Sequence, residues 1–200
     1  MTTRERVLDA ALSSFGGTGY DGTSLDQVAA ELGIRKQTIL YYYPSKVELL
    51  DAVIDASSAE LASTLEAALA NAGPGWDRVE AIIRSVFRLA LRRPELLGLL
   101  REVSRLGPPA ATRLSENLEP LVKRAREFLE AEMAAGHMRT TDARLVLLST
   151  YSTVLGVATE VEVLRAVGIE PTLRSMVIRR RELLQFLRSA LVVDDPPSPS

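Results

Sequence analysis

Apolar side chains recur at helical spacing along almost the entire chain, and this periodicity constrains the fold more than any other feature. The segment 76–92, for example, places Val79, Ile83 and Val86 on one face, as an amphipathic helix requires. Nowhere do apolar and polar residues alternate in the pattern of a half-buried strand. The sequence therefore predicts an all-α protein of about nine helices. The predicted helices cover 3–15, 24–31, 35–42, 45–70, 76–92, 94–106, 110–135, 142–167 and 171–193.

Composition excludes several classes of protein. A formal net charge of −2 argues against a protein that coats nucleic acid without specificity, because such proteins carry a strong excess of Lys and Arg. The chain contains no Cys, so it forms no disulfide and no thiolate metal site. The longest apolar stretch, 145–158, is interrupted by Ser and Thr and is shorter than the roughly 20 residues of a membrane span. Because the first residues also lack the apolar segment of a signal peptide, we expect a cytoplasmic protein.

Two short helices joined by a glycine turn are predicted near the N-terminus. Ser24 and Gln27 have the spacing of a capping box before the first of them, and Gly33 after it suits the left-handed conformation of a tight turn. The second helix must end before Pro44, which lacks an N–H and pushes the preceding residue out of the α region. This layout is typical of a helix-turn-helix, whose second helix enters the major groove of DNA.

A basic strip follows the turn, although the protein as a whole is slightly acidic. Residues 34–46 hold three positive charges and no acidic residue. The strip offers cations for phosphate or guanine, an amide and a hydroxyl for base edges, and phenols that can bond phosphate. Lys46 would lie at the positive end of the next helix dipole, where a cation is disfavoured unless a phosphate lies beside it. The predicted DNA contacts in the strip are Arg35, Lys36, Gln37, Thr38, Tyr41, Tyr42 and Lys46.

Two stretches around these helices resemble the TetR family of bacterial regulators. Residues 15–34, with FGGTGYDGTS followed by VAAELGI, look like the opening of the family, and TILYYYPSKVELL at 38–50 is similar to its recognition helix and the turn after it. The resemblance implies that Thr23 and Lys46 hold phosphates, and the predicted DNA-binding set also includes Ser24. It further implies that Lys36 and Gln37 approach bases or backbone, and that Tyr41 and Tyr42 dock the helix.

The chain also departs from the pattern of the family within the second short helix. Leu40 stands where the family usually has Tyr, and Arg35 and Gln37 stand where a small Ser and Gly are frequent. The operator sequence therefore does not follow from the resemblance.

The resemblance also implies how the rest of the chain is organised. Helices 142–167 and 171–193 pair with their copies in a four-helix dimer bundle, and their surplus of apolar residues supports this independently. The predicted domains are 1–47 for DNA binding, 48–193 for ligand binding and dimerisation, and 194–200 as a flexible tail. The predicted dimer contacts are Val154, Val157, Val161, Leu184, Leu187 and Leu191.

The helices between the DNA-binding part and the dimer bundle are predicted to surround an apolar pocket. Its predicted lining offers few polar anchors, so a hydrophobic or aromatic effector is favoured over a sugar. The helix at 45–70 joins the DNA-binding part to this pocket, and a ligand that prefers the DNA-incompatible state would release a palindromic operator. The predicted lining residues are Leu61, Ile83, Phe87, Leu100, Leu118, Val122 and Tyr151.

Less specific interpretations compete with a functional one at several positions. Tyr43 precedes Pro44 and is expected in the core rather than on DNA. The glycine cluster at 16–22 lacks the Gly-Lys-Ser/Thr ending of a phosphate loop and is expected to be a turn. The lone His137 is expected to be solvated or to cap a helix, without a metal. The arginine run at 179–181 is typical of a solvated face.

The sequence carries no signature of an enzyme. It contains no Gly-x-Ser-x-Gly elbow, no nucleotide fingerprint and only one His to act as a base, and no cofactor is predicted. The alternative from another class is a helical carrier or adaptor for an apolar ligand, whose helix-turn-helix serves only for packing. Such a unit has no reason to keep Arg35, Lys36 and Lys46 free of acidic neighbours in sequence.

Overall fold

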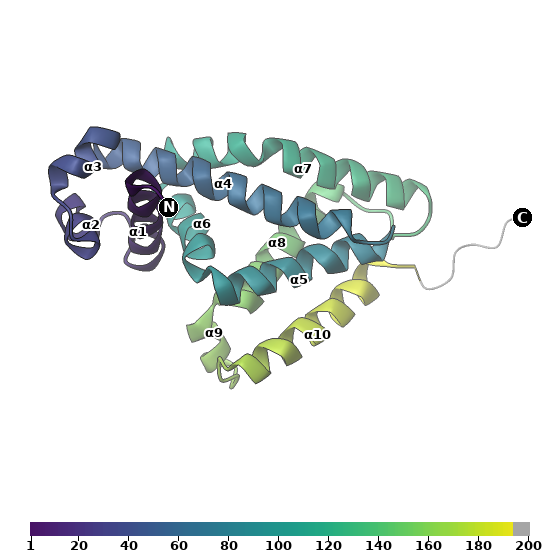
Figure 1. The fold of residues 1–200 in the computed structure, drawn as a ribbon. Helices are drawn as coiled ribbons and strands as arrows, with labels where there is room; N and C mark the ends of the chain where they lie inside the picture. The colour runs from purple at the N-terminus through teal and green to yellow at the C-terminus, as the bar shows by residue number, and fades with distance from the viewer. Residues whose placement is uncertain (194–200) are drawn as a thin grey trace, which may run out of the picture. The chain divides into compact units, whose positions relative to one another are not determined.

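The computed structural model describes residues 1–193, and over that range the chain is built from ten helices and contains no extended strand (Figure 1). The all-α prediction is confirmed. The predicted tail at 194–200 lies outside the described residues. The helices are α1 Thr3–Gly17, α2 Leu25–Leu32, α3 Lys36–Tyr42, α4 Lys46–Ala70, α5 Trp76–Arg92, α6 Pro94–Leu106, α7 Ala110–Ala134, α8 Ala143–Thr159, α9 Val161–Ala166 and α10 Leu173–Leu191.

The additional helix arises because the segment predicted as one helix at 142–167 is broken at Glu160. This residue has φ −82° and ψ 78°, which is outside the helical region. The Thr159 hydroxyl donates to the Leu155 carbonyl oxygen at 2.8 Å, and β-branched residues stand at 157, 159, 161 and 163. Such residues weaken a helix locally, while apolar periodicity alone does not reveal the break.

Side-chain caps set the ends of the first helices. At α1, Thr2 accepts a hydrogen bond from the Glu5 backbone N–H while the Glu5 carboxylate accepts from the Thr2 backbone N–H. Ser24 and Gln27 make the same reciprocal pair at the start of α2. Each box satisfies backbone donors that a helix N-terminus otherwise leaves unpaired. The predicted capping box at Ser24 is therefore confirmed, and α1 has a second one.

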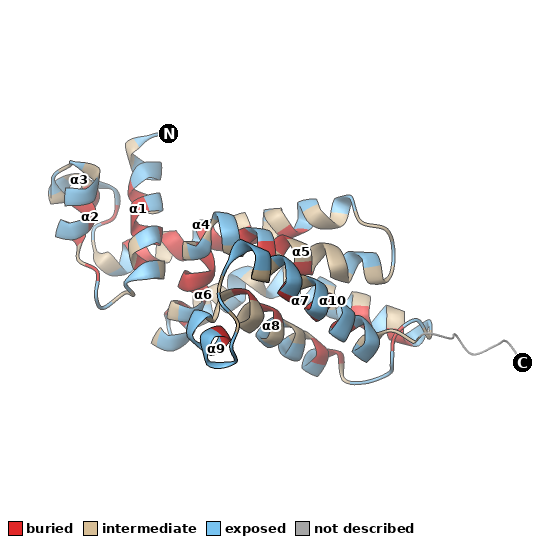
Figure 2. Cartoon of the chain, turned by 90° about the horizontal axis from the view of Figure 1, so that it is seen from below, coloured by how far each residue is buried: buried red, intermediate tan, exposed pale blue. Residues whose placement is uncertain are grey.

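The chain folds into two compact units, and the first comprises residues 1–62 and 92–119. Its core is drawn from α1, α2, α3, the first half of α4 and α6, as the buried segments in Figure 2 show. Phe15, Val28, Ile39 and Leu49 are fully buried in this core. Tyr43 is 4% exposed, so its prediction as a core residue is confirmed.

Within this unit, α1 and α6 approach each other closely at two glycines. A Cβ on Gly16 would overlap the Glu95 carbonyl oxygen, and a Cβ on Gly98 would overlap the Gly16 carbonyl oxygen. Only residues without a side chain let two helix backbones approach so closely. Gly17, the next residue of α1, has open space at its Cβ position. The glycine cluster predicted as a turn therefore also contributes a packing contact to α6.

Polar contacts join the loop after α1 to the same helix. Glu102 of α6 accepts a hydrogen bond from the Tyr20 backbone N–H at 2.6 Å. Arg105 contacts Asp21 at 2.9 Å and Glu102 at 2.8 Å. The Arg105 guanidinium is the largest cause that holds the pKa of Glu102 below its ordinary value. The α1–α2 loop is thereby tied to α6 by both backbone packing and charge.

The second unit comprises, among the described residues, 63–91 and 120–193. One cluster of buried side chains joins α5, α8 and α10 around Ile83, Phe87 and Leu183, and a second joins α7 to the start of α8 around Met133 and Val146. The two units are defined by packing, and the functional boundary at residue 47 stays a prediction. No helix among residues 1–193 is long and apolar enough to cross a membrane.

The prediction of a solvated face for the arginine run at 179–181 is wrong for its first member. Arg179 is 7% exposed, because it faces α8 and its Nη1 donates to the Val157 carbonyl oxygen. Arg181 is exposed and contacts Glu182 at 2.7 Å. A run of like charges on a helix turns by about 100° per residue, so its members cannot share one environment.

Candidate nucleic-acid interface

A tight glycine turn positions α3 against α2. Gly33 adopts φ 64° and ψ 31°, the left-handed conformation, and the Ile34 N–H donates back to the Ala29 carbonyl at 3.0 Å. This pattern ends α2 in the manner of a Schellman motif. Ile39, which is fully buried, then anchors α3 on the core. The predicted helix-turn-helix layout is present, with Arg35 as the N-cap residue of α3.

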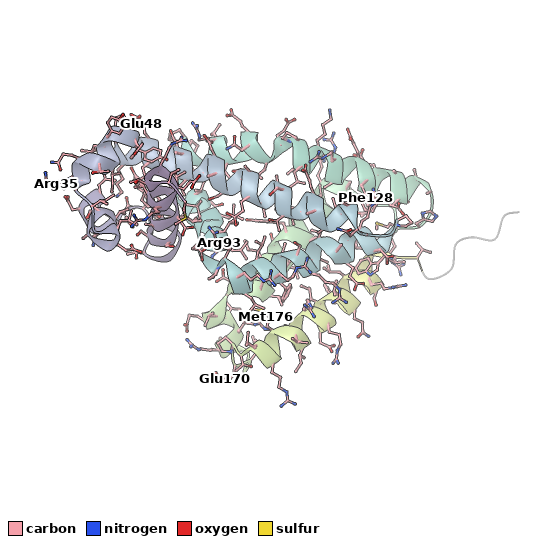
Figure 3. The ribbon with its side chains drawn as sticks, viewed as in Figure 1. Arg35, Glu48, Arg93, Phe128, Glu170 and Met176 are labelled. Carbon is pink, nitrogen blue, oxygen red and sulfur yellow. The ribbon has the colours of Figure 1, made fainter. Side chains whose placement is uncertain are left out.

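The other face of α3 is open to solvent. Arg35 and Gln37 are exposed, and Figure 3 draws the Arg35 side chain extending away from the ribbon. Tyr41 is 81% exposed and Tyr42 37% exposed, with their rings in an edge-to-face contact at 5.1 Å. Thr38 is half-buried. The open face thus combines a cation, an amide and phenols on a helix whose opposite side is fixed in the core.

Lys36 has an acidic partner that lies ten residues earlier in the chain, so the charges within residues 34–46 did not reveal it. Its Nζ lies 2.8 Å from Asp26 Oδ2 of α2, and both side chains are substantially exposed. The acid-free strip at 34–46 is therefore acid-free in sequence but not in space. A surface pair of this kind contributes only about 0–1 kcal/mol, so Lys36 can exchange Asp26 for another anion at little cost.

Lys46 lies at the first position of α4 with an aromatic partner. Its Nζ is 4.0 Å from the centroid of the Tyr20 ring, a cation–π geometry. Ser45 accepts a hydrogen bond from the Glu48 backbone N–H at 3.1 Å and so caps the helix. Burial, followed by the nearby Asp21 and Asp51, raises the pKa of the Tyr20 phenol. Tyr20 was not among the predicted site residues, because its ring meets Lys46 only after the unit folds.

Thr23 and Ser24 are both engaged within the chain. Thr23 is 5% exposed, its hydroxyl donates to the Gly19 carbonyl at 2.8 Å, and its backbone N–H donates to the Tyr20 carbonyl at 3.2 Å. Ser24 is half-buried, and its Oγ accepts the capping bond from Gln27. The Ser24 hydroxyl proton stays available to an anion, whereas both donors of Thr23 are already used.

The predicted pocket residues are divided between the two units. Leu61, Leu100 and Leu118 belong to the first unit, where Leu61 and Leu100 are buried and Leu118 is half-buried. In the second unit Ile83 and Phe87 are 1% exposed and lie in the cluster with α8 and α10. Val122 and Tyr151, also in the second unit, are 54% and 50% exposed. A shared role for these residues in ligand binding stays a prediction.

The predicted dimer contacts have different environments in the single chain. Val154, Leu184 and Leu187 are between 5% and 8% exposed, because they pack in the cluster of α5, α8 and α10. These residues are covered within their own chain and cannot supply the contact surface themselves. Val157 and Leu191 are half-buried, and Val161 is 39% exposed.

Other apolar side chains of the same helices are uncovered. On α8, Leu145 and Leu148 are 59% and 60% exposed, and on α10 Val177 and Phe186 are 58% and 61% exposed. The surplus of apolar residues on these helices is therefore exposed, but the exposed side chains are neighbours of the predicted dimer contacts. Apolar periodicity indicates how much of a helix is apolar, and only packing decides which part stays open.

Comparison with known proteins identifies the N-terminal part of this fold. A family model for bacterial regulatory proteins of the tetR family matches residues 7–53. The HTH-type transcriptional repressor DrrR1 from Streptomyces coeruleorubidus is 36% identical over 109 residues, which cover 54% of this chain and 39% of that protein. The chain matches less than half the length of such curated relatives.

Solved structures resemble almost the whole chain. A TetR transcriptional regulator from Chloroflexus aurantiacus has a TM-score of 0.76 at 21% identity, covering 96% of each chain. The transcriptional regulator FadR from Bacillus subtilis, solved in complex with stearoyl-CoA, has a TM-score of 0.75 at 17% identity, covering 92% of this chain and 96% of that chain. At these identities the likeness shows a shared fold.

Proposed function

The chain belongs to the TetR family of bacterial regulatory proteins, and from this premise we propose that it is a transcriptional repressor that binds operator DNA as a homodimer. In this proposal α3 enters the major groove, and two-fold symmetry places two copies of α3 on a palindromic site. A small apolar or aromatic molecule releases the protein from DNA. The protein acts by binding rather than by catalysis, and its DNA partner places it in the cytoplasm.

The observation that carries the proposal is the two-sided character of α3. Ile39 holds one side of the helix in the core, while Tyr41 is 81% exposed on the other. Arg35 and Gln37, both exposed, stand at the N-terminal end of the helix, the part that faces base edges in this motif. A guanidinium can contact guanine or phosphate, and an amide can contact adenine in bidentate form. A helix that served only for packing would also have a polar outer face, but it would not require a tyrosine that is 81% exposed there.

The start of α4 supports the proposal through phosphate contacts. Lys46 stands at the positive end of the α4 dipole, where its charge is unfavourable in isolation and favourable beside an anion. The Tyr20 ring positions its Nζ. The Ser24 hydroxyl proton and the unpaired backbone N–H groups in the first turns of α2 and α4 supply further donors of the kind that position proteins on the DNA backbone. Phosphate contacts set affinity and orientation, whereas the α3 side chains set sequence preference.

Exposed apolar surface supports the homodimer. Leu145 and Leu148 on α8 and Val177 and Phe186 on α10 are each more than half exposed. Uncovered apolar side chains in such number mark an interaction surface. A second copy of the chain would cover them with the same residues, as a two-fold interface requires. Leu145 and Leu148 are three residues apart and share one face of α8, whereas Val177 and Phe186 are nine residues apart and lie on opposite sides of α10. The proposed contact surface therefore takes Leu145 and Leu148 from α8 and Phe186 from α10.

The release step rests on α4 and on the apolar character of the predicted pocket. Helix α4 is continuous over Lys46–Ala70 and supplies residues to both compact units. The Bacillus subtilis FadR structure holds stearoyl-CoA, so a protein with this fold accepts a ligand that carries a long apolar chain. We infer that an effector of this chain likewise contains a substantial apolar part. The factor by which the effector lowers DNA affinity is set by how much more tightly it binds the DNA-incompatible state than the DNA-binding state.

Selection of DNA by the purified protein tests the proposal. The protein should enrich a palindrome whose half-sites lie about one helical turn apart. Gln37→Ala should then alter the base preference at one half-site position, by about 1–3 kcal/mol if the amide makes a bidentate contact. Lys46→Ala should weaken binding to all sequences alike and reduce the slope of log affinity against log salt concentration by about one.

Lys123→Ala is the matched control, because it removes the same charge from an exposed site on α7 outside the proposed interface. It should leave both operator affinity and salt dependence unchanged. Failure to enrich any sequence would refute the DNA-binding proposal and favour a helical carrier. Equal effects of Lys46→Ala and Lys123→Ala would show that the start of α4 does not contact DNA.

A further inference from the structure

A buried positive charge without an acidic partner lies between α8 and α10. Arg179 is 7% exposed, its Nη1 donates to the Val157 carbonyl oxygen, and its buried Nε has no hydrogen-bond partner. Burial lowers the pKa of its guanidinium, and none of the ion pairs found among residues 1–193 includes Arg179. A guanidinium stays protonated in proteins. A buried, unpaired charge of this kind is costly and therefore requires an explanation.

The same arginine lines a cavity at the start of α10. The cavity has a volume of about 340 Å³ and is lined by residues 168–170, 172, 174, 175, 178 and 179. Thr172, the N-cap of α10, precedes Ser175 by three residues and Arg179 by seven. This spacing places the three residues on one face of the helix. The cavity therefore combines a helix N-terminus and a buried cation, while the Thr172 and Ser175 hydroxyls are engaged in the capping box and with the Glu170 carbonyl oxygen.

The apolar part of the cavity wall comes from Ile169 and Ile178. Arg174, which is exposed, adds a second positive charge at the rim. The cavity is an open hollow in the surface rather than an enclosed pocket, and its volume lies at the lower end of the range for small-molecule sites, about 300–1,000 Å³. A hollow that combines positive charge with aliphatic side chains is the complement of a small amphipathic anion.

The acidic groups near the cavity are otherwise placed. Glu170 is exposed just before α10 (Figure 3), and its backbone carbonyl accepts a hydrogen bond from Ser175 Oγ at 2.5 Å. On α9, Glu162 is paired with Arg165 at 2.7 Å. Neither of these two carboxylates is paired with Arg179 among residues 1–193.

We propose that the cavity at the start of α10 binds the anionic oxygen group of a small amphipathic molecule, a carboxylate or a phosphate, with Arg179 as its buried counter-charge. Arg174 and the first backbone N–H groups of α10 face the same anion. Ile169 and Ile178 contact the apolar body of the molecule. This site lies outside the predicted pocket residues and does not depend on DNA binding.

Titration of the full-length protein with sodium octanoate, octanol and inorganic phosphate tests the proposal. Nuclear magnetic resonance of the arginine Nε–H groups follows Arg179 directly, and calorimetry gives the affinity. Octanoate should shift the Arg179 Nε–H resonance to saturation, whereas octanol, which lacks the charge, should not. Saturation by phosphate as well would show that the anion alone suffices. Response to octanoate alone would assign the site to carboxylates with an apolar body.

Variants on α10 separate a binding role from a structural one. Arg179→Met should weaken octanoate binding by about tenfold or more, the loss expected for a charged hydrogen bond. Arg174→Met, which removes an exposed side chain and leaves the fold undisturbed, should weaken it severalfold. Arg181→Met is the matched control, because it removes the same charge from an exposed position on the same helix, and it should bind octanoate as the unmodified protein does.

Three results would overturn the proposal. The first is the absence of saturable binding of octanoate and phosphate to the unmodified protein. The second is equal octanoate affinity for the unmodified protein and for both Arg174→Met and a folded Arg179→Met. The third is an Arg179 Nε–H resonance that shifts with protein concentration without added anion, because the counter-charge would then come from a second copy of the chain.

Discussion

The contact between α1 and α6 allows a sharp test with two adjacent glycines of α1. A Cβ at Gly16 would overlap the Glu95 carbonyl oxygen, whereas a Cβ at Gly17 meets nothing within 4 Å. Neither glycine has a positive φ, so alanine fits the backbone conformation at both positions. Replacement of Gly by Ala within a helix stabilises it by about 0.5–1 kcal/mol. Gly17→Ala should therefore leave the free energy of unfolding unchanged or raise it by up to about 1 kcal/mol.

Gly16→Ala stabilises the helix by the same amount as Gly17→Ala, but its Cβ forces α6 away from α1. The overlapping atom is a backbone oxygen, so no side-chain rotation relieves it, and overpacking of this kind costs about 1–3 kcal/mol. We expect Gly16→Ala to be less stable than Gly17→Ala by about 1–3 kcal/mol. For a chain of this size, each kcal/mol lowers the melting temperature by roughly 2–4 °C.

Urea and thermal unfolding, followed by far-ultraviolet circular dichroism at one protein concentration, measure the difference. A fixed concentration is necessary because oligomer formation makes apparent stability depend on it. Gly98→Ala should behave like Gly16→Ala, because its Cβ would overlap the Gly16 carbonyl oxygen. The double variant should cost less than the sum, since one displacement of α6 relieves both overlaps. Equal stability of Gly16→Ala and Gly17→Ala would refute the close-packing argument.

Three further predictions follow from charge and burial. Arg105 lowers the folded pKa of Glu102 below its ordinary 4.5. The ionised Glu102 therefore stabilises the fold above about pH 4.5, and this stabilisation is lost as pH falls through the folded pKa. Glu102→Gln should reduce the loss of stability at acid pH in urea titrations, and an unchanged loss would contradict the assignment. Phe186→Glu should dissociate the dimer in light scattering and leave the chain folded, whereas Leu187→Glu should lower the melting temperature of the chain itself, because Leu187 is 5% exposed. A dimeric Phe186→Glu would exclude the Phe186 side of α10 from the interface. Asp26→Asn releases Lys36 and removes a negative charge near the proposed DNA phosphates. Operator affinity, measured by fluorescence anisotropy, should rise severalfold at low salt and less at high salt. A lower affinity would show that the ion pair positions Lys36 for DNA.

The sequence alone was sufficient wherever a feature depends on residues close together in the chain. The capping box at Ser24, the left-handed Gly33 and the start of α6 at Pro94 all matched the prediction. Each involves backbone groups within a few residues, so local chemistry determines it. The all-α class followed for the same reason, because apolar spacing reports the period of the backbone. The open polar face of α3 belongs to this group, since the turn and Ile39 orient the helix.

The tertiary structure alone decided which faces of the later helices are covered and which charges meet. Leu187 and Phe186 are neighbours on α10, yet one is buried against α5 and α8 and the other is 61% exposed. Asp26 reaches Lys36 across the glycine turn, and Arg179 turns away from its neighbour Arg181 into the fold. The physical reason is that burial and ion pairing depend on distance in space. Helical periodicity gives the direction of each side chain about its own axis, but the partner it meets there is set only when the helices pack.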